Sequence, residues 1–328
     1  MEQQTLTVSK HFVRDLADGQ SVDSVFVVRD RARRQKKNGE AFLKLQLGDV
    51  TGSVEAVVWD AVDDLYQHCC PGGIVRVLGN FSVDPKYGNS LTVRALRAAE
   101  PGEYEARDLE EGPAHAPEQM IADLRSLVGT MQDPYLRELL DRFFAEGSAI
   151  WERWSHAPAA KYYHQAYRHG LLEHCLSVAE GVSALSATFP GIDRDVAVAG
   201  ALLHDIGKIE AYSAEGSAIE LTDSGRLQGE IPLGYYLVRR QIEEIPGFPP
   251  PCAEALLHII LSHHGQLEHG SPVVPCTREA TLVHMVDNLG GRLGSFDRLE
   301  KSLAEGERWS NFDRALSGAA FFASREAA

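Results

Sequence analysis

The most constraining feature of this chain of 328 residues is an adjacent His–Asp pair, His204-Asp205, set in an apolar run. The run from Val196 to Ile206 is otherwise almost wholly apolar. Burying an imidazole and a carboxylate there costs several kcal/mol unless both groups are satisfied. A divalent cation satisfies both of them. With His174 upstream and Asp287 downstream, the sequence predicts one metal site made by His174, His204, Asp205 and Asp287.

The amino-acid sequence around these residues is similar to that of a known superfamily. Four segments resemble, in order, the HD-domain phosphohydrolases: Tyr167–His174, His204–Lys208, Ser262–Gly265 and Val283–Asn288. The resemblance implies an all-α HD domain over about residues 119–300 that binds divalent metal and hydrolyses phosphoesters. It also places the last metal ligand of the family at Asp287.

The resemblance implies further roles at the same site. Asp205 would bridge two metals through its two oxygens, and His263 and His264 would be ligands or contact phosphate. Lys208 would contact the substrate phosphate and offset developing charge, so the catalytic candidates are Asp205, Lys208 and His264. Two other interpretations stay open. The histidine pair is also consistent with an exposed helix end, and Lys208 with a surface lysine.

Two positions depart from the pattern of the family. Glu230 stands where the family has His, and Gly290 stands where an acid is expected. Glu is a hard-metal ligand and would shift the preference toward Mn²⁺ or Mg²⁺, although an ordinary glutamate at a helix N-terminus fits equally well. The expected cofactor is therefore one or two divalent ions, Mn²⁺ first, with Fe²⁺, Co²⁺, Zn²⁺ and Mg²⁺ as alternatives.

Residues 1–100 have the pattern of short strands separated by turns. The five β-rich segments are Ser24–Val28, Ala41–Leu47, Val54–Trp59, Gly73–Leu78 and Ser90–Arg94, with a short helix before the fourth. This order resembles an OB-fold. The predicted fold class is thus multidomain, a small all-β OB-fold barrel followed by an all-α HD domain.

A basic segment follows the first of these strands and predicts a nucleic-acid-binding loop, because basic grooves of OB-folds track phosphate backbones. Its members are Arg29, Arg31, Arg33, Arg34, Lys36 and Lys37. Phe42 and Tyr87 are the candidates for base stacking, with the barrel core as their alternative place. A solvated charged loop is the alternative interpretation of the basic run.

The rest of the chain divides by composition. Residues 101–118 are rich in acid, Gly and Pro and indicate a linker, residues 119–300 have helical periodicity, and residues 301–328 form a tail. The net charge is −15, yet the first 100 residues carry 13 Lys/Arg and 13 Asp/Glu. The whole acidic excess therefore lies in the helical part, where carboxylates and metal are expected.

The composition indicates the compartment of the protein and the redox state of its cysteines. No apolar run approaches a membrane span and no signal region is present, so we expect a cytoplasmic protein without membrane contact. The five cysteines have no zinc-site spacing and indicate reduced thiols. A homo-oligomer is compatible with the sequence.

Taken together, the two regions resemble the YhaM-type 3′→5′ exoribonucleases. The resemblance implies a metal-dependent phosphodiester hydrolase that shortens single-stranded RNA from its 3′ end and releases nucleoside 5′-monophosphates; single-stranded DNA is the alternative partner. Two other functions stay open. One is a phosphohydrolase of small or cyclic nucleotides, and the other is a non-catalytic nucleic-acid-binding protein.

Overall fold

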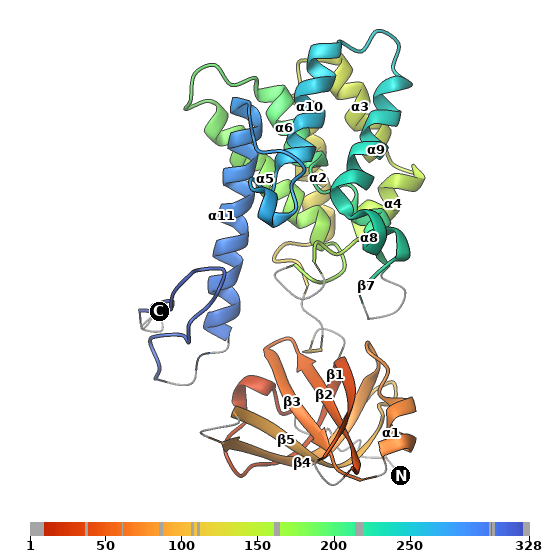
Figure 1. The fold of residues 1–328 in the computed structure, drawn as a ribbon, viewed down its shortest axis with the longest axis vertical. Helices are drawn as coiled ribbons and strands as arrows, with labels where there is room; N and C mark the ends of the chain where they lie inside the picture. Colours follow the sequence, from red (N-terminus) through yellow and green to blue (C-terminus); the bar gives the residue numbers. More distant parts are fainter. Residues whose placement is uncertain are drawn as a thin grey trace, which may run out of the picture.

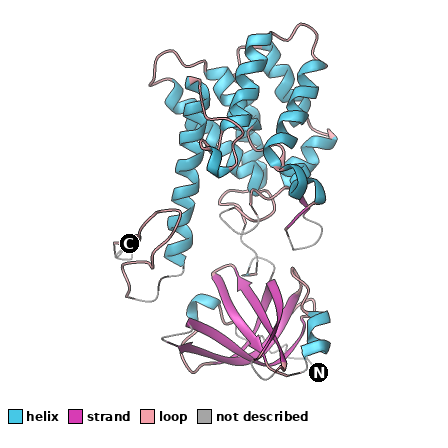
Figure 2. Ribbon diagram, viewed as in Figure 1, coloured by secondary structure: helices cyan, strands magenta, loops and turns pink. Residues whose placement is uncertain are grey.

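The computed structural model places an N-terminal β-barrel beside a helical domain (Figures 1 and 2). The residues that the structure describes are 10–36, 39–60, 62–84, 88–105, 108–109, 112–160, 165–213, 219–301, 303 and 306–323. Lys37 and Tyr87, two of the predicted nucleic-acid ligands, lie outside the described residues. The fold class predicted from the sequence is confirmed.

The barrel closes in the strand order β1-β2-β3-β5-β4, and only the β3–β5 pair is parallel. This is the five-stranded OB arrangement. Alternate residues of each strand fill the core; Leu43, Leu45 and Leu47 of β2 are all buried. The elements are β1 (Ser21–Gln35), β2 (Ala41–Asp49), β3 (Gly52–Val58), α1 (Val62–His68), β4 (Ile74–Asp84) and β5 (Gly88–Ala98), after a 3₁₀ turn at Val13–Asp15.

The part of the basic segment that carries its four arginines is a strand, because β1 runs on to Gln35, so the prediction of a basic loop is wrong there. The pairing of β1 with β2 shifts register at Arg29, and residues 30–35 then pair with β2, Arg34 opposite Phe42 and Arg31 opposite Leu45. A strand sends successive side chains to opposite faces, which a loop need not do. The basic residues are therefore divided between two faces of the sheet.

Ten α-helices among the described residues form the second part, and its core is one continuous apolar cluster. Helices α5, α6, α10 and α11 pack on one another and carry the predicted metal ligands or end beside them. The described helices here are α2 (Pro117–Gly129), α3 (Pro134–Phe144), α4 (Ala149–His156), α5 (Gly170–Ser186), α6 (Arg194–Leu203), α7 (Lys208–Ala211), α8 (Asp223–Gln228), α9 (Glu230–Glu243), α10 (Pro250–Ser262) and α11 (Arg278–Lys301), with a small hairpin of β6 (Tyr212–Ser213) and β7 (Glu220–Leu221) and a 3₁₀ turn at Leu267–His269.

Local signals explain where several helices begin. Asp133 caps α3 by accepting from the amides of Tyr135 and Leu136, with Pro134 at the first turn. Asp193 caps α6 in the same way through the amide of Val196. Within the described residues, no helix combines the length and the apolarity needed to cross a membrane.

Candidate metal centre and nucleic-acid face

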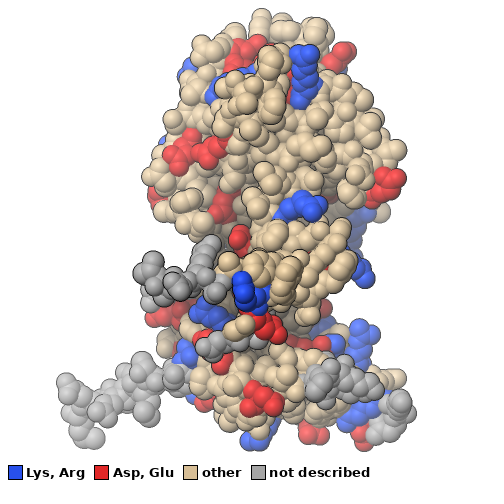
Figure 3. Space-filling model, turned by 90° about the vertical axis from the view of Figure 1, so that its left-hand side faces the viewer, with Lys and Arg blue, Asp and Glu red and all other residues tan. Residues whose placement is uncertain are grey.

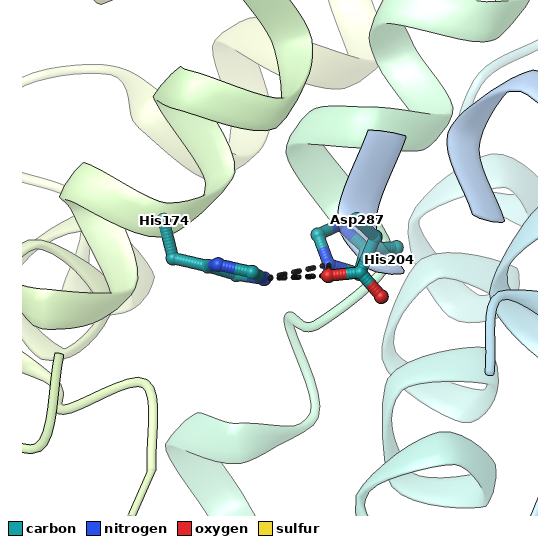
Figure 4. Close-up of side chains that lie close together, drawn as sticks. All are labelled: His174, His204 and Asp287. Carbon is teal, nitrogen blue, oxygen red and sulfur yellow. Dashed lines mark hydrogen bonds and ion pairs between the residues drawn. The ribbon is translucent and has the colours of Figure 1, made fainter. Parts of the chain in front are cut away.

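Three elements bring the four predicted ligands together. His174 lies on α5, Asp287 lies on α11, and His204-Asp205 directly follow α6 (Figure 4). His174 Nε2 is 3.2 Å from His204 Nε2, 3.3 Å from Asp205 Oδ2 and 3.2 Å from Asp287 Oδ1. His204 Nε2 is 3.4 Å from Asp205 Oδ2 and 3.8 Å from Asp287 Oδ1. We call these four residues the HD cluster.

The donor atoms of this cluster fit a divalent metal. Ligand atoms roughly 2.0–2.2 Å from one metal stand about 3–3.6 Å from one another, close to the separations seen here. His204 Nδ1 lies 2.7 Å from the carbonyl oxygen of Ala201. Donation to that carbonyl fixes the proton on Nδ1 and turns the lone pair of Nε2 toward the cluster.

A second group of ligand atoms adjoins the first. His263 Nε2 is 3.5 Å from Asp205 Oδ1, and its Nδ1 is 2.8 Å from the carbonyl oxygen of Ile260. Both His263 Nε2 and Asp205 Oδ1 are buried without a hydrogen-bond partner among the described residues. Two unpartnered buried acceptors that face each other are costly unless a cation lies between them. The two oxygens of Asp205 thus face different ligand groups.

Glu230 and His264 lie at the outer side of this second group. His264 Nε2 is 4.0 Å from Glu230 Oε1, and both side chains are 28% exposed. His264 Nδ1 is 2.9 Å from the carbonyl oxygen of His269, which again leaves Nε2 as the free ligand atom. Glu230 is the first residue of α9, so the structure brings it to the cluster and also to a helix N-terminus.

Lys208 is held by the cluster. Its Nζ is 2.6 Å from Asp205 Oδ2, and its side chain is 14% exposed. Burial alone would lower the pKa of Lys208, but the carboxylate of Asp205 outweighs it and raises this pKa. The lysine is therefore a fixed cation at the edge of the site, which differs from the picture of a surface lysine.

The metal-free cluster retains a proton. Burial lowers the pKa of His174, but its bonds with Asp205 and Asp287 together outweigh burial and raise the pKa to about 9. Burial opposes ionisation of Asp287, yet the bond to His174 leaves its pKa below the ordinary value. Without a metal, His174 is therefore protonated at neutral pH, and its positive charge lies between two carboxylates. A bound metal would take the place of that charge.

The outer face of the barrel carries basic and aromatic side chains. A hollow of about 630 Å³ is lined by Arg34, Phe42 and Lys44 together with their neighbours. The Phe42 ring packs against the Trp59 ring at 5.1 Å between centroids, and Lys36 Nζ lies 5.1 Å from the Trp59 centroid. Trp59 is 42% exposed. We call Arg34, Lys36, Phe42, Lys44 and Trp59 the barrel face.

The structure separates other predicted nucleic-acid ligands from this face. Arg31 donates to the carbonyl oxygen of Tyr66 and lies over its ring, and Arg29 donates to the carbonyl oxygen of Asp49. Arg33 pairs with the core position Leu43, so it also lies on the other side of the strand. Trp59, which was not among the predicted stacking residues, also lies on this face, and its place at the end of an alternating strand, one residue after the buried Val58, was a usable signal.

A cavity of about 1540 Å³ lies between the barrel and the helical domain. His174, Gly181 and Gly290 line it from the helical side, and Arg29 and Thr51 line it from the barrel side. Figure 3 shows a narrowing between the two parts, with basic and acidic side chains mixed on both. His174 is the member of the HD cluster that lines this space, which residues of both domains border.

Comparisons with known proteins agree with this arrangement. Residues 171–291 match the family model of the HD domain. The chain is 30% identical over 290 residues to the 3'-5' exoribonuclease YhaM of Geobacillus sp. (strain WCH70), covering 88% of each chain. It is 30% identical over 293 residues to the same-named protein of Bacillus subtilis (strain 168), covering 88% of this chain and 90% of that one. The chain therefore belongs to the YhaM family of HD-domain proteins.

Proposed function

We propose that this protein is a metal-dependent 3′→5′ exoribonuclease that removes nucleoside 5′-monophosphates from single-stranded RNA. The observation that carries the proposal is the HD cluster, whose His174 lines the interdomain cavity, in a chain 30% identical to YhaM exoribonucleases over 88% of its length. The cavity is large enough for more than a single small ligand, since ordinary small-molecule pockets span roughly 300–1,000 Å³.

His174, His204, Asp205 and Asp287 are the proposed ligands of the first metal, and His263, His264 and Glu230 with the second oxygen of Asp205 those of the other. A metal held by these residues would lower the pKa of a bound water and clamp a phosphate oxygen. Asp205 orients both ligand groups because each of its oxygens faces one of them. Lys208, already 2.6 Å from Asp205, offsets charge that develops on the phosphate.

The barrel face is the proposed holding site for the RNA. Arg34, Lys36 and Lys44 would neutralise phosphates, and the Phe42–Trp59 pair would offer a surface on which bases stack without sequence preference. Arg29, Arg31 and Arg33 would act at the margin of this face, because the strand turns them to its other side. The 3′ end would reach the HD cluster through the interdomain cavity.

Four further proposals concern the metal, the nucleic acid, the compartment and the oligomeric state. Manganese is the proposed metal because Glu230 adds a hard carboxylate to the ligand set. RNA rather than DNA rests on the names of the relatives. The cytoplasm is the proposed compartment, consistent with five cysteines that are all free. A homo-oligomer is supported by an exposed apolar stripe on α11, made by Met285, Leu289, Leu293 and Phe296.

The test uses RNA whose last internucleotide phosphate is radiolabelled. With Mn²⁺ the wild-type protein should release labelled nucleoside 5′-monophosphate, and Asp205→Asn should not. Asp141→Asn is the matched control, because Asp141 lies on α3, whose residues do not contribute to the cluster. Chelation of the metal should stop the release, and renewed Mn²⁺ should restore it.

Other outcomes identify the alternatives. Turnover of mononucleotides or cyclic nucleotides with intact RNA indicates a phosphohydrolase of small nucleotides. Tight RNA binding without any turnover in the presence of Mn²⁺, Fe²⁺, Co²⁺, Zn²⁺ or Mg²⁺ indicates a binding protein whose HD domain is inactive.

A further inference from the structure

The segment that joins the two domains is fastened to the barrel. Glu103 accepts from Arg76 at 2.6 Å and from Arg97 at 2.5 Å, and both arginines belong to barrel strands. The amide of Val50, in the β2–β3 turn, donates to the carbonyl oxygen of Asp108 at 3.1 Å. Leu109 is fully buried. The connection is therefore bonded to the barrel at Glu103 and Asp108, two of its described residues.

The same segment is fastened to the helical domain by one carboxylate. The amide of Ala114 donates to Glu173 Oε1 at 2.7 Å. The other oxygen of Glu173 accepts from Gln165 Nε2 at 3.3 Å and from the hydroxyl of Tyr167. Glu173 is 8% exposed and lies in the first turn of α5, where the helix dipole favours a negative charge.

This carboxylate lies directly beside the candidate active site. Glu173 precedes His174 on α5, and both residues line the interdomain cavity together with Ala114. Barrel residues Arg29 and Thr51 line the same cavity. One buried group thus joins the connecting segment to the helix that carries a proposed metal ligand.

We propose that Glu173 is a positioning residue that anchors the connecting segment and so aligns the barrel face with the HD cluster. The inference rests on the proposed exoribonuclease function and adds to it how a held RNA reaches the site. The barrel face and the HD cluster can act on one RNA only if the connecting segment favours a geometry in which both contact it. A looser connecting segment lowers the effective concentration, at the HD cluster, of RNA that is held on the barrel face. Glu173 limits the motion of the connecting segment at the end that lies nearer the HD cluster.

The contact suits a carboxylate better than a neutral amide. Glu173 meets three donors with two oxygens, and an ionised carboxylate is an acceptor only. A glutamine could keep its oxygen on the amide of Ala114, but its NH₂ group would then have to donate to the hydroxyl of Tyr167 and to a flipped amide of Gln165. Bonds to a charged acceptor are roughly twice as strong as neutral ones, so Glu173→Gln should weaken the anchor while keeping the side-chain volume.

The experiment compares two substrates in the full-length protein with Mn²⁺. One is an RNA of about 20 nucleotides, longer than the roughly 4–16 that an OB-fold occupies, and the other is a dinucleotide with a single phosphodiester. For Glu173→Gln, kcat/KM on the long RNA should fall about tenfold or more, chiefly through KM, while the dinucleotide stays within about twofold. The radius of gyration from small-angle X-ray scattering should increase.

Two variants control the interpretation. Ala114→Pro removes the amide donor without touching α5, and it should reproduce the Glu173→Gln effect without adding to it in the double variant. Glu152→Gln makes the same change on α4, at an exposed position outside the cavity lining, and should alter neither substrate. Thermal unfolding of each variant shows that it is folded.

The outcomes separate this inference from the proposed function. An equal loss on both substrates in Glu173→Gln means that the residue acts on the metal site, and no loss on either means that the contact is dispensable; both results overturn the inference. If the wild-type protein degrades neither substrate, the proposed function is wrong. The scattering then still decides the anchor, because an unchanged radius of gyration in Glu173→Gln overturns it.

Discussion

Gly207, two residues after Asp205, is the position where an added methyl group should do the most damage near the site. A Cβ at Gly207 would lie 1.9 Å from the carbonyl oxygen of Glu230 and 2.5 Å from the amide nitrogen of Gly234. Both atoms belong to the backbone of α9, which cannot yield as a flexible side chain does. Gly207 therefore sets how closely α9 approaches the turn that carries His204-Asp205.

The size of the effect follows from these contacts. Carbon and oxygen normally approach no closer than about 3.3 Å, so Gly207→Ala must move α9 by roughly 1.4 Å. Overpacking of this kind costs about 1–3 kcal/mol, and we expect the upper end because backbone has to move. For a domain of 150–250 residues, about 3 kcal/mol corresponds to a Tm lowered by roughly 6–12 °C.

The same movement displaces Glu230, which begins α9. A misplacement of about 1 Å can cost a hundredfold in rate, so activity should fall even below the melting temperature. Gly290→Ala is the control, since a Cβ there meets no described atom within 4 Å and the helix gains about 0.5–1 kcal/mol. Differential scanning calorimetry measures both variants. A Tm of Gly207→Ala equal to that of the wild type would refute the reasoning.

Three further predictions address the metal and the RNA. The pKa of His174 is about 9 in the metal-free fold and 6.5 when unfolded, so its stabilisation is complete below pH 6.5 and is lost as pH rises through 9. Mn²⁺ must displace that proton, and calorimetry should show affinity rising up to about tenfold per pH unit from 7 to 8; a pH-independent affinity contradicts this. Trp59→Ala should weaken RNA binding by about 1–3 kcal/mol in fluorescence anisotropy, whereas Tyr236→Ala, at a more exposed aromatic on α9, should not. Glu230→His should shift the metal preference from Mn²⁺ toward Zn²⁺ in activity titrations, and an unchanged preference would exclude Glu230 as a ligand.

Sequence patterns within single helices and strands were enough to predict most of the fold. A polar His–Asp pair at the end of an apolar helix is stable in few ways other than by binding a metal. The structure agrees, since most pairs among the four predicted ligands approach within 4 Å: His174, His204, Asp205 and Asp287. Strand alternation and turn residues likewise identified the barrel. Both are periodic signals within one element, which a sequence displays directly.

Contacts between distant elements could not be predicted in the same way. Arg31 and Arg34 look alike in the basic run, but pairing with Leu45 and Phe42 sends them to opposite faces. The bond from Ala114 to Glu173 joins residues 59 positions apart. Gly290, unexplained by pattern, lies on α11 at the wall of the cavity with open space beside it.

The most direct test of the account is the fate of 5′-labelled single-stranded RNA with Mn²⁺, wild-type protein beside Asp205→Ala. The account predicts products that shorten progressively from the 3′ end with the wild type and unchanged RNA with the variant. RNA that stays intact with both proteins, or that is shortened equally by both, would contradict the central claim that this HD cluster hydrolyses RNA.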